Sequence, residues 1–155
     1  MAGDVIRTAS ELSQGNLAPD ELLKWLAEIV KQLRGLESVS CGGAGEFIAT
    51  ENKGTVEINP ATKNPVPNYS RRVLGFVASD QLKAIIASDI VTEELLSTLD
   101  GEHSAANYFS RALATILATE KRALIGNFGA WTVTQRPDMQ RFILFRSRPA
   151  INRML

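Results

Sequence analysis

Apolar positions in two parts of the chain recur at the spacing of an amphipathic helix. Residues 20–34 place six of them on one face: Leu22, Leu23, Leu26, Ile29, Val30 and Leu33. Pro19 suits the first turn of this helix and Gly35 its end. A shorter helix is predicted over residues 4–14, and a second long helix runs from Ser104, as its cap, to about residue 122.

After each long helix the apolar period changes from 3.6 to 2, which predicts β-strands. Residues 39–50 and 123–135 are interpreted as hairpins that turn at glycines, and residues 143–145 as part of a returning strand. Residues 79–99 have a helical pattern that is interrupted near Ser88. The pattern therefore predicts a mixed α+β protein.

Residues 54–70 differ from the rest of the chain. They contain Pro60, Pro65 and Pro67 and too few apolar residues to lie in a core. Such a segment is typical of an exposed, extended arm. The corresponding place later in the chain holds only residues 136–140, which predicts a tight connection.

The two halves of the sequence align with each other at an offset of 84 residues. Segment 38–47 falls on segment 122–131, and the apolar phase agrees upstream. The aligned pairs include Trp25 with Phe109, Ile29 with Leu113, Leu33 with Leu117, Gly45 with Gly129 and Phe47 with Trp131. We therefore expect two units, residues 1–87 with the long arm and residues 88–155 with a truncated one.

The composition, 45% hydrophobic and 22% charged residues, is that of a globular protein with a core. No apolar run approaches the ~20 residues that span a bilayer, and no secretory signal precedes the first helix. A lone Cys41 and a lone His103 argue against a disulfide, a metal site or a His-based triad. We expect a cytoplasmic protein without cofactors or enzymatic activity, since no phosphate-cradling loop or nucleophile–base spacing is found.

The charge is polarised along the chain although the net charge is zero. Residues 1–120 carry ten Lys/Arg and sixteen Asp/Glu, whereas residues 121–155 carry seven Lys/Arg and one acid, Asp138. The basic end predicts a surface for anionic partners such as nucleic acid. A solvated face that offsets the acidic helices is the alternative.

Three short segments carry a resemblance to a known family. Residues 43–47 (Gly-Ala-Gly-Glu-Phe) and 127–131 (Asn-Phe-Gly-Ala-Trp) resemble the Gly-Phe-Gly-x-Phe turn of the HU and integration host factor proteins. Residues 59–63 (Asn-Pro-Ala-Thr-Lys) resemble the arm tip of that family, Asn-Pro-x-Thr-Gly. Phe76 and Phe145 stand where its returning strand meets the last helix.

The resemblance implies an intertwined two-fold dimer in which a helical base carries two β-arms that embrace the minor groove of DNA. The proline at an arm tip then wedges between base steps and kinks the duplex. Here one polypeptide would supply both halves as a pseudo-dimer. A homodimer that exchanges the same interface is the alternative that the sequence leaves open.

The chain departs from the family pattern in ways that bear on DNA binding. Ala44 replaces the turn aromatic, and Val77 and Asp80 follow the first returning strand where lysines are expected. Arg146 and Arg148 keep positive charge in the second half. Because each missing cation removes a phosphate contact, we expect DNA binding that is asymmetric and weaker than the family norm.

The candidate DNA-binding residues are those of the arm and of the basic end: Asn59, Pro60, Lys63, Arg71, Arg72, Arg136, Arg141, Arg146 and Arg148. We expect the late arginines to cluster on one strand pair, with Arg146 and Arg148 on the same side of an extended segment. Pro60 is either a wedge or only a turn residue. Trp25 and Trp131 are interpreted as core residues and not as base-stacking platforms.

The sequence favours a non-enzymatic DNA-binding, DNA-bending protein whose partner is double-stranded DNA at the nucleoid. The alternative is a module of the same fold that has lost most DNA affinity and binds a protein partner, since the first 120 residues are acidic and the second arm is short.

Overall fold

The computed structural model describes residues 3–52, 55–58, 60–68, 71–88, 90–138 and 140–155. The helices are α1 (Val5–Leu12), α2 (Pro19–Gln32), α3 (Asp80–Ser88), α4 (Glu93–Ser97), α5 (Ser104–Thr119) and α6 (Pro149–Asn152). The strands are β1 (Gly3–Asp4), β2 (Ser38–Ser40), β3 (Gly45–Asn52), β4 (Thr55–Ile58), β5 (Pro65–Asn68), β6 (Arg71–Ala78), β7 (Arg122–Ile125), β8 (Gly129–Gln135) and β9 (Arg141–Ser147). The mixed α+β class that the sequence predicts is confirmed.

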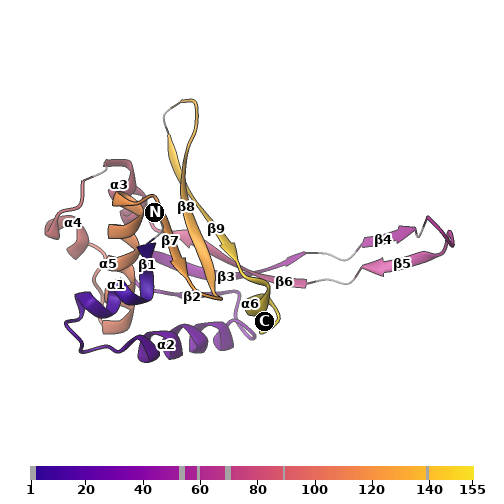
Figure 1. The fold of residues 1–155 in the computed structure, drawn as a ribbon, viewed down its shortest axis with the longest axis horizontal. Helices are drawn as coiled ribbons and strands as arrows, with labels where there is room; N and C mark the ends of the chain where they lie inside the picture. Colours follow the sequence, from indigo (N-terminus) through magenta and orange to yellow (C-terminus); the bar gives the residue numbers. More distant parts are fainter. Residues whose placement is uncertain (1–2, 53–54, 59, 69–70, 89, 139) are drawn as a thin grey trace.

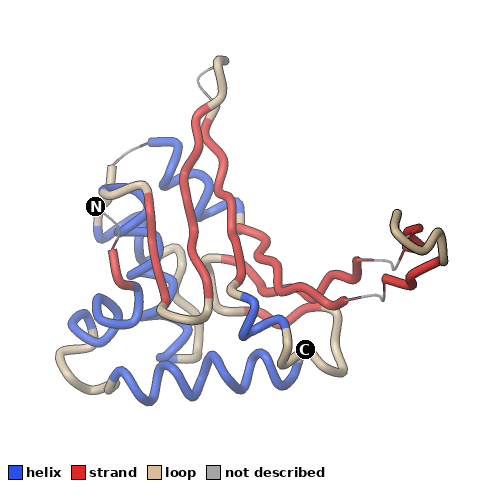
Figure 2. Tube along the Cα trace, turned by 45° about the vertical axis from the view of Figure 1, so that its right-hand side comes forward, coloured by secondary structure: helices blue, strands red, loops and turns tan. Residues whose placement is uncertain are grey.

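The strands form two main sheets and one arm. One sheet has the order β2-β3-β6, the other has the order β1-β7-β8-β9, and β4 pairs only with β5. The two sheets meet where β6 packs beside β9. Helices α1, α3, α4 and α5 gather on one side of the sheets and α6 lies apart from them near the C-terminus, while the β4–β5 hairpin extends far from the body and the β8–β9 hairpin extends in another direction (Figures 1 and 2).

The strand registers of the two sheets match at the 84-residue offset of the sequence. Val39 pairs with Phe47 between β2 and β3, and Ala123 pairs with Trp131 between β7 and β8. The returning strands also correspond, since Gly45 lies opposite Ala78 and Gly129 lies opposite Ser147. The hairpin turns, and with them the faces on which side chains lie, are thus set in the same way in both sheets.

Aromatic rings from both sheets and from α5 form one core. Phe47, Phe109 and Trp131 are fully buried. The ring centroids of Phe47 and Phe76 lie 5.4 Å apart, and those of Trp131 and Phe145 lie 4.7 Å apart. Tilted and edge-on pairs at these distances add to the large apolar area that aromatic side chains bury. The prediction that Trp131 is a core residue is confirmed.

The two long helices differ in how much of their surface is covered. α5 is rich in alanine and buries ten of its residues, because α1 packs along it and α3 packs on another side. α2 buries only Leu22, Leu26, Ile29 and Val30, and α4 does not pack along it in the described part of the chain. α5 is therefore the central helix, whereas α2 keeps an open face.

Three local details differ from the sequence expectations. The cap of α5 is His103 and not Ser104, because the His103 imidazole Nδ1 accepts a hydrogen bond from the Ala106 N–H at 3.4 Å. The predicted first helix is preceded by β1, whose Gly3 and Asp4 pair in parallel with β7. Trp25 is only partly buried and stacks on His103 with ring centroids 6.1 Å apart.

Candidate nucleic-acid interface

The second sheet carries exposed arginines on the face that points away from the aromatic core. Trp131 and Phe145 pair across β8 and β9 and lie inward, so their neighbours Ala130 and Arg146, which also pair, lie outward. Arg122 of β7 pairs with Thr132 on the same outer face. Strand alternation and register therefore bring Arg122 and Arg146 to one surface.

Arg148 joins this surface directly after β9. Its backbone N–H donates to the Phe128 carbonyl at 3.0 Å, and Pro149 starts α6 at the next position. Arg122, Arg146 and Arg148, hereafter the arginine patch, line a hollow of about 600 Å³ together with Thr132 and Leu144. Leu144 is 52% exposed, so the hollow combines positive charge with an apolar contact.

The three guanidinium groups of the arginine patch are exposed and available to a ligand. In the part of the chain that the structure describes, no carboxylate lies within ion-pair distance of them. Guanidinium groups bind phosphate oxygens through planar, bidentate hydrogen bonds. An anionic polymer could lie across this face without breaking an internal ion pair.

Arg141 and Arg136 do not join the patch. Arg141 lies at the far end of β9 from Arg146, on the inner face with Phe145, and its Nη1 donates to the Ile86 carbonyl at 3.1 Å. Arg141 and Arg146 thus lie on the same strand pair, as expected, but they face opposite sides, because two residues five apart on a strand do so. Arg136, near the tip of the β8–β9 hairpin, lies over the Phe142 ring with 4.7 Å between its Cζ and the ring centroid.

The arm carries the other candidates. Pro60 and Lys63 are exposed at its tip, and Lys63 has a positive φ of 56°, as is common in tight turns. Asn59 and the side chain of Arg71 lie outside the described residues. Arg72 is half-buried, and its Nη1 donates to the Arg34 carbonyl at 3.3 Å, so this guanidinium faces the end of α2.

Where its side chains are described, the outer face of the first sheet has no equivalent of the arginine patch. Ser38 stands where the second sheet has Arg122, and Val77 stands where it has Arg146. Glu46, opposite Val77, adds a negative charge to this face. Among the described side chains, the outward-facing arginines therefore gather on the second sheet and not on the first.

Arg122 is the residue of this surface that the sequence candidates missed. The 84-residue offset places it at the start of a strand, and its register with Thr132 decides that it faces outward. Its position at the start of the basic segment, residues 121–155, was the signal in the sequence. Which face of the sheet Arg122 lies on cannot be assigned without the strand register.

The described residues were also compared with the requirements of a metal site, a membrane-spanning helix and a reactive thiol. No group of three His, Cys, Asp or Glu side chains that could hold a metal is found among them. Nor does any helix in the described ranges have the length and hydropathy that would let it cross a membrane. Burial raises the pKa of the Cys41 thiol far above its usual range, so this thiol stays protonated and unreactive.

Comparison with known proteins gives one informative relative. No family model matches the chain. The chain is 32% identical over 101 residues to the integration host factor subunit alpha of Methylococcus capsulatus, across 64% of this chain and 90% of that protein. Identity at this level over nearly the whole relative shows that the chain belongs to the HU and integration host factor family.

Proposed function

We propose that this chain is a non-enzymatic protein that binds double-stranded DNA, with the arginine patch as its principal contact. The observation that carries this proposal is the gathering of Arg122, Arg146 and Arg148 on one exposed sheet face. Phosphate contacts from such groups supply most sequence-independent affinity for duplex DNA. Family membership supports an architectural role over other anion-binding roles.

The proposal includes a pseudo-dimer in which residues 1–87 and 88–155 are two units of one chain. The matching registers of β2–β3 and β7–β8 support this arrangement, and so does the core that Phe47 and Trp131 share. Covalent fusion replaces a concentration-dependent association with an intramolecular one.

In this proposal DNA contact is asymmetric. The β4–β5 arm reaches the minor groove with Pro60 as its wedge, and Lys63 and the two arginines at its base contact phosphates. The opposite hairpin is shorter and offers Arg136 near its tip. Since only one sheet carries the arginine patch, we expect fewer phosphate contacts than two equal halves would make.

Salt-dependent binding tests the proposal directly. Affinity for a ~30 base-pair duplex should be micromolar or better in about 50 mM salt and should fall steeply as salt rises. The variant Arg146→Gln should reduce the slope of log K against log salt by about 0.9, because one phosphate contact is lost. Arg7→Gln, which removes an exposed arginine from α1, is the matched control and should leave the slope unchanged. Absence of binding to the duplex in about 50 mM salt would contradict the proposal.

The arm is tested by DNA bending. Energy transfer between dyes at the ends of the duplex should report a bend with the unchanged chain and a smaller bend with Pro60→Ala, at similar affinity. An equal bend in both would remove the wedge role and leave Pro60 as a turn residue.

One observation favours a second function, which is protein binding without DNA. The first sheet presents Ser38, Glu46 and Val77 outward, and none of its outer positions with a described side chain holds an arginine or lysine. A pull-down that recovers a protein partner after nuclease treatment would favour this function. Retention that nuclease abolishes would count against it.

A further inference from the structure

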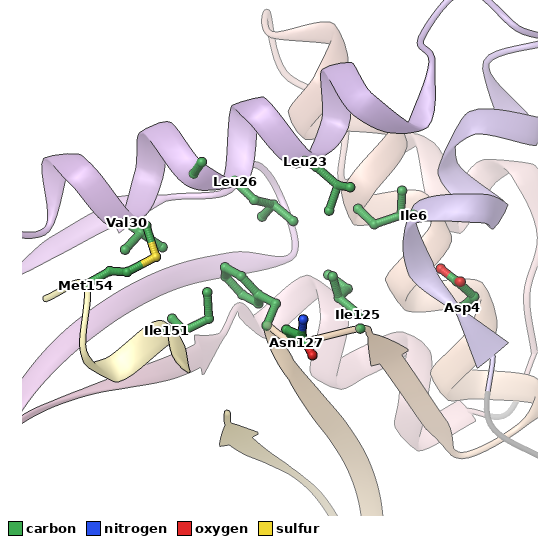
Figure 3. A pocket seen from close by; sticks show the side chains of 12 residues that line it. Asp4, Ile6, Leu23, Leu26, Val30, Ile125, Asn127, Ile151 and Met154 are labelled. Carbon is green, nitrogen blue, oxygen red and sulfur yellow. The ribbon is translucent and has the colours of Figure 1, made fainter. Parts of the chain in front are cut away.

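An apolar groove of about 460 Å³ lies beside α2 (Figure 3). Its walls include Leu23, Leu26 and Val30 of α2, Phe128 of the turn before β8, and Ile151 and Met154 at the end of the chain. Leu23 is 46% exposed and Met154 is 42% exposed. A cluster of this kind is costly to leave in water, which makes it a candidate interaction site.

In the other half of the molecule the segment Leu99–Gly101 occupies part of the corresponding place and lines a hollow of about 650 Å³ there. There the loop between α4 and α5 lies on the turn before β3, and the Gly43 N–H donates to the Leu99 carbonyl at 3.1 Å. A Cβ on Gly43 would overlap the Leu99 backbone, so the two segments are in close contact. Leu99 is fully buried.

Two side chains of α5 hold this loop in place. The Asn107 amide donates to the Gly101 carbonyl at 2.9 Å and accepts from the Gly101 N–H at 2.7 Å. Arg111 donates from Nε to the Asp100 carboxylate at 2.8 Å. The segment Leu99–Gly101 is thus fixed by three residues, Gly43, Asn107 and Arg111.

The three positions that hold Leu99–Gly101 correspond, at the 84-residue offset, to lining residues of the apolar groove. Gly43 corresponds to Asn127, Asn107 to Leu23 and Arg111 to Ala27, and all three of these line the groove. The α1–α2 loop does not cover them, because Ser10 and Ser13 hold Leu17 beside α1. The groove is therefore the counterpart of a site that Leu99–Gly101 partly occupies, with apolar Leu23 and Ala27 in place of the polar Asn107 and Arg111.

We propose that the apolar groove binds a short leucine-bearing segment of a partner protein, in the manner in which the other half binds its own Leu99. In the partner segment, apolar residues should follow the leucine. Asn107 and Arg111 bind the polar Asp100–Gly101 in the other half, and Leu23 and Ala27 stand at the corresponding positions of the groove. In the described part of the chain the Asn127 N–H has no acceptor, so it can donate to a carbonyl of the segment as Gly43 does. This site is separate from the arginine patch and does not depend on DNA binding.

A peptide taken from the chain itself provides the probe. A synthetic peptide with the sequence of residues 94–103 and the change Asp100→Leu is titrated into the methyl-labelled full chain. The methyl signals of Leu23 and Met154 should shift in a saturable way, and those of Leu36, an exposed leucine outside the groove, should not. The same peptide with Leu99→Asp as well should bind at least about tenfold more weakly, because the buried apolar contact is lost.

Protein variants complete the test. Leu23→Asp should weaken peptide binding about tenfold or more, whereas Leu36→Asp, an equivalent change at a 54% exposed leucine, should stay within about twofold. If Leu23→Asp does not fold by circular dichroism, the methyl shifts of the unchanged chain decide. Absence of saturable shifts, or equal loss in both variants, overturns the proposal. Self-association that Leu23→Asp abolishes would also overturn it, because a second copy would then be the occupant.

Discussion

Trp131 lies at the centre of the core, but its indole N–H makes no hydrogen bond among the described residues. It is the largest of the fully buried side chains, and rings from both sheets surround it. Its indole Nε1 has no hydrogen-bond partner among the described residues. A buried donor without an acceptor costs about 1–3 kcal/mol.

The first prediction follows from this orphaned donor. Trp131→Phe should lower the free energy of unfolding by no more than about 1.5 kcal/mol, because loss of the N–H offsets part of the cavity cost. Trp131→Ala should cost about 3–5 kcal/mol. Chemical denaturation of both variants checks this; a Phe variant as damaged as the Ala variant would show that the indole makes an undetected bond.

At the scale of elements, the close contact between the turn before β3 and the α4–α5 loop joins segments far apart in the sequence. Gly43 has no room for a side chain there, because backbone and not a flexible side chain lies against it. Ser110 of α5 supports the same turn by accepting from the Ala44 N–H at 3.2 Å.

The second prediction concerns Gly43→Ala. The new methyl group should force the loop and the turn apart and cost about 2–3 kcal/mol in thermal or chemical unfolding. Gly35→Ala is the matched control, since a Cβ there meets nothing within 4 Å. The control should change stability by no more than about 0.5 kcal/mol. Equal effects at the two glycines would mean that the Leu99 contact is not tight in solution.

The third prediction concerns pH and the same loop. Hydrogen bonds from Arg111 hold the pKa of Asp100 below its usual range. A carboxylate with a lowered native pKa stabilises the fold above its unfolded pKa of about 3.9, and this stabilisation is lost as the pH falls through the native value. Unfolding at a series of pH values from about 5 to about 2 should therefore show a smaller acid-induced loss in Asp100→Asn than in the unchanged chain.

The control for the acid effect is Arg111→Gln, which removes the hydrogen bonds that lower the pKa of Asp100 and should give the same smaller acid-induced loss. Identical profiles for Asp100→Asn and the unchanged chain would show that the Arg111 pair contributes no pH dependence.

At the scale of the whole molecule, both sheets and α5 share one core, so neither half has a complete core of its own. Phe47 of the first sheet contacts the rings of Phe109 and Trp131. β6 also packs beside β9, and the Leu74 N–H of β6 donates to Asn152 of α6 at 3.0 Å. The two halves should unfold together.

The fourth prediction follows from the proposed pseudo-dimer. The chain should sediment with a mass near 16.9 kDa at every concentration tested, and its Tm should not depend on concentration. A homodimer that exchanges its halves would instead have twice this mass and a Tm that rises with concentration. That result would contradict closure of one chain on itself.

The pattern of apolar residues determined the local structure of this protein. The 3.6 and 2 periodicities predicted α2, α5 and both hairpins because these periods reflect which side of an element is buried. The aligned segments 38–47 and 122–131 also take matching registers. The prolines of residues 54–70 indicated an arm, and in its described part β4 pairs with β5.

Tertiary structure alone decided which residues share a surface. Strand register places Arg122 beside Arg146 and turns Arg141 inward to the Ile86 carbonyl, and a shift by one residue would reverse these faces. Likewise, only packing determines that the α4–α5 loop covers Gly43 while the groove beside Leu23 stays open. The local sequence determines the apolar period of each helix or strand. Which faces of different elements pack together depends on contacts between residues far apart in the chain, and no local pattern specifies those contacts.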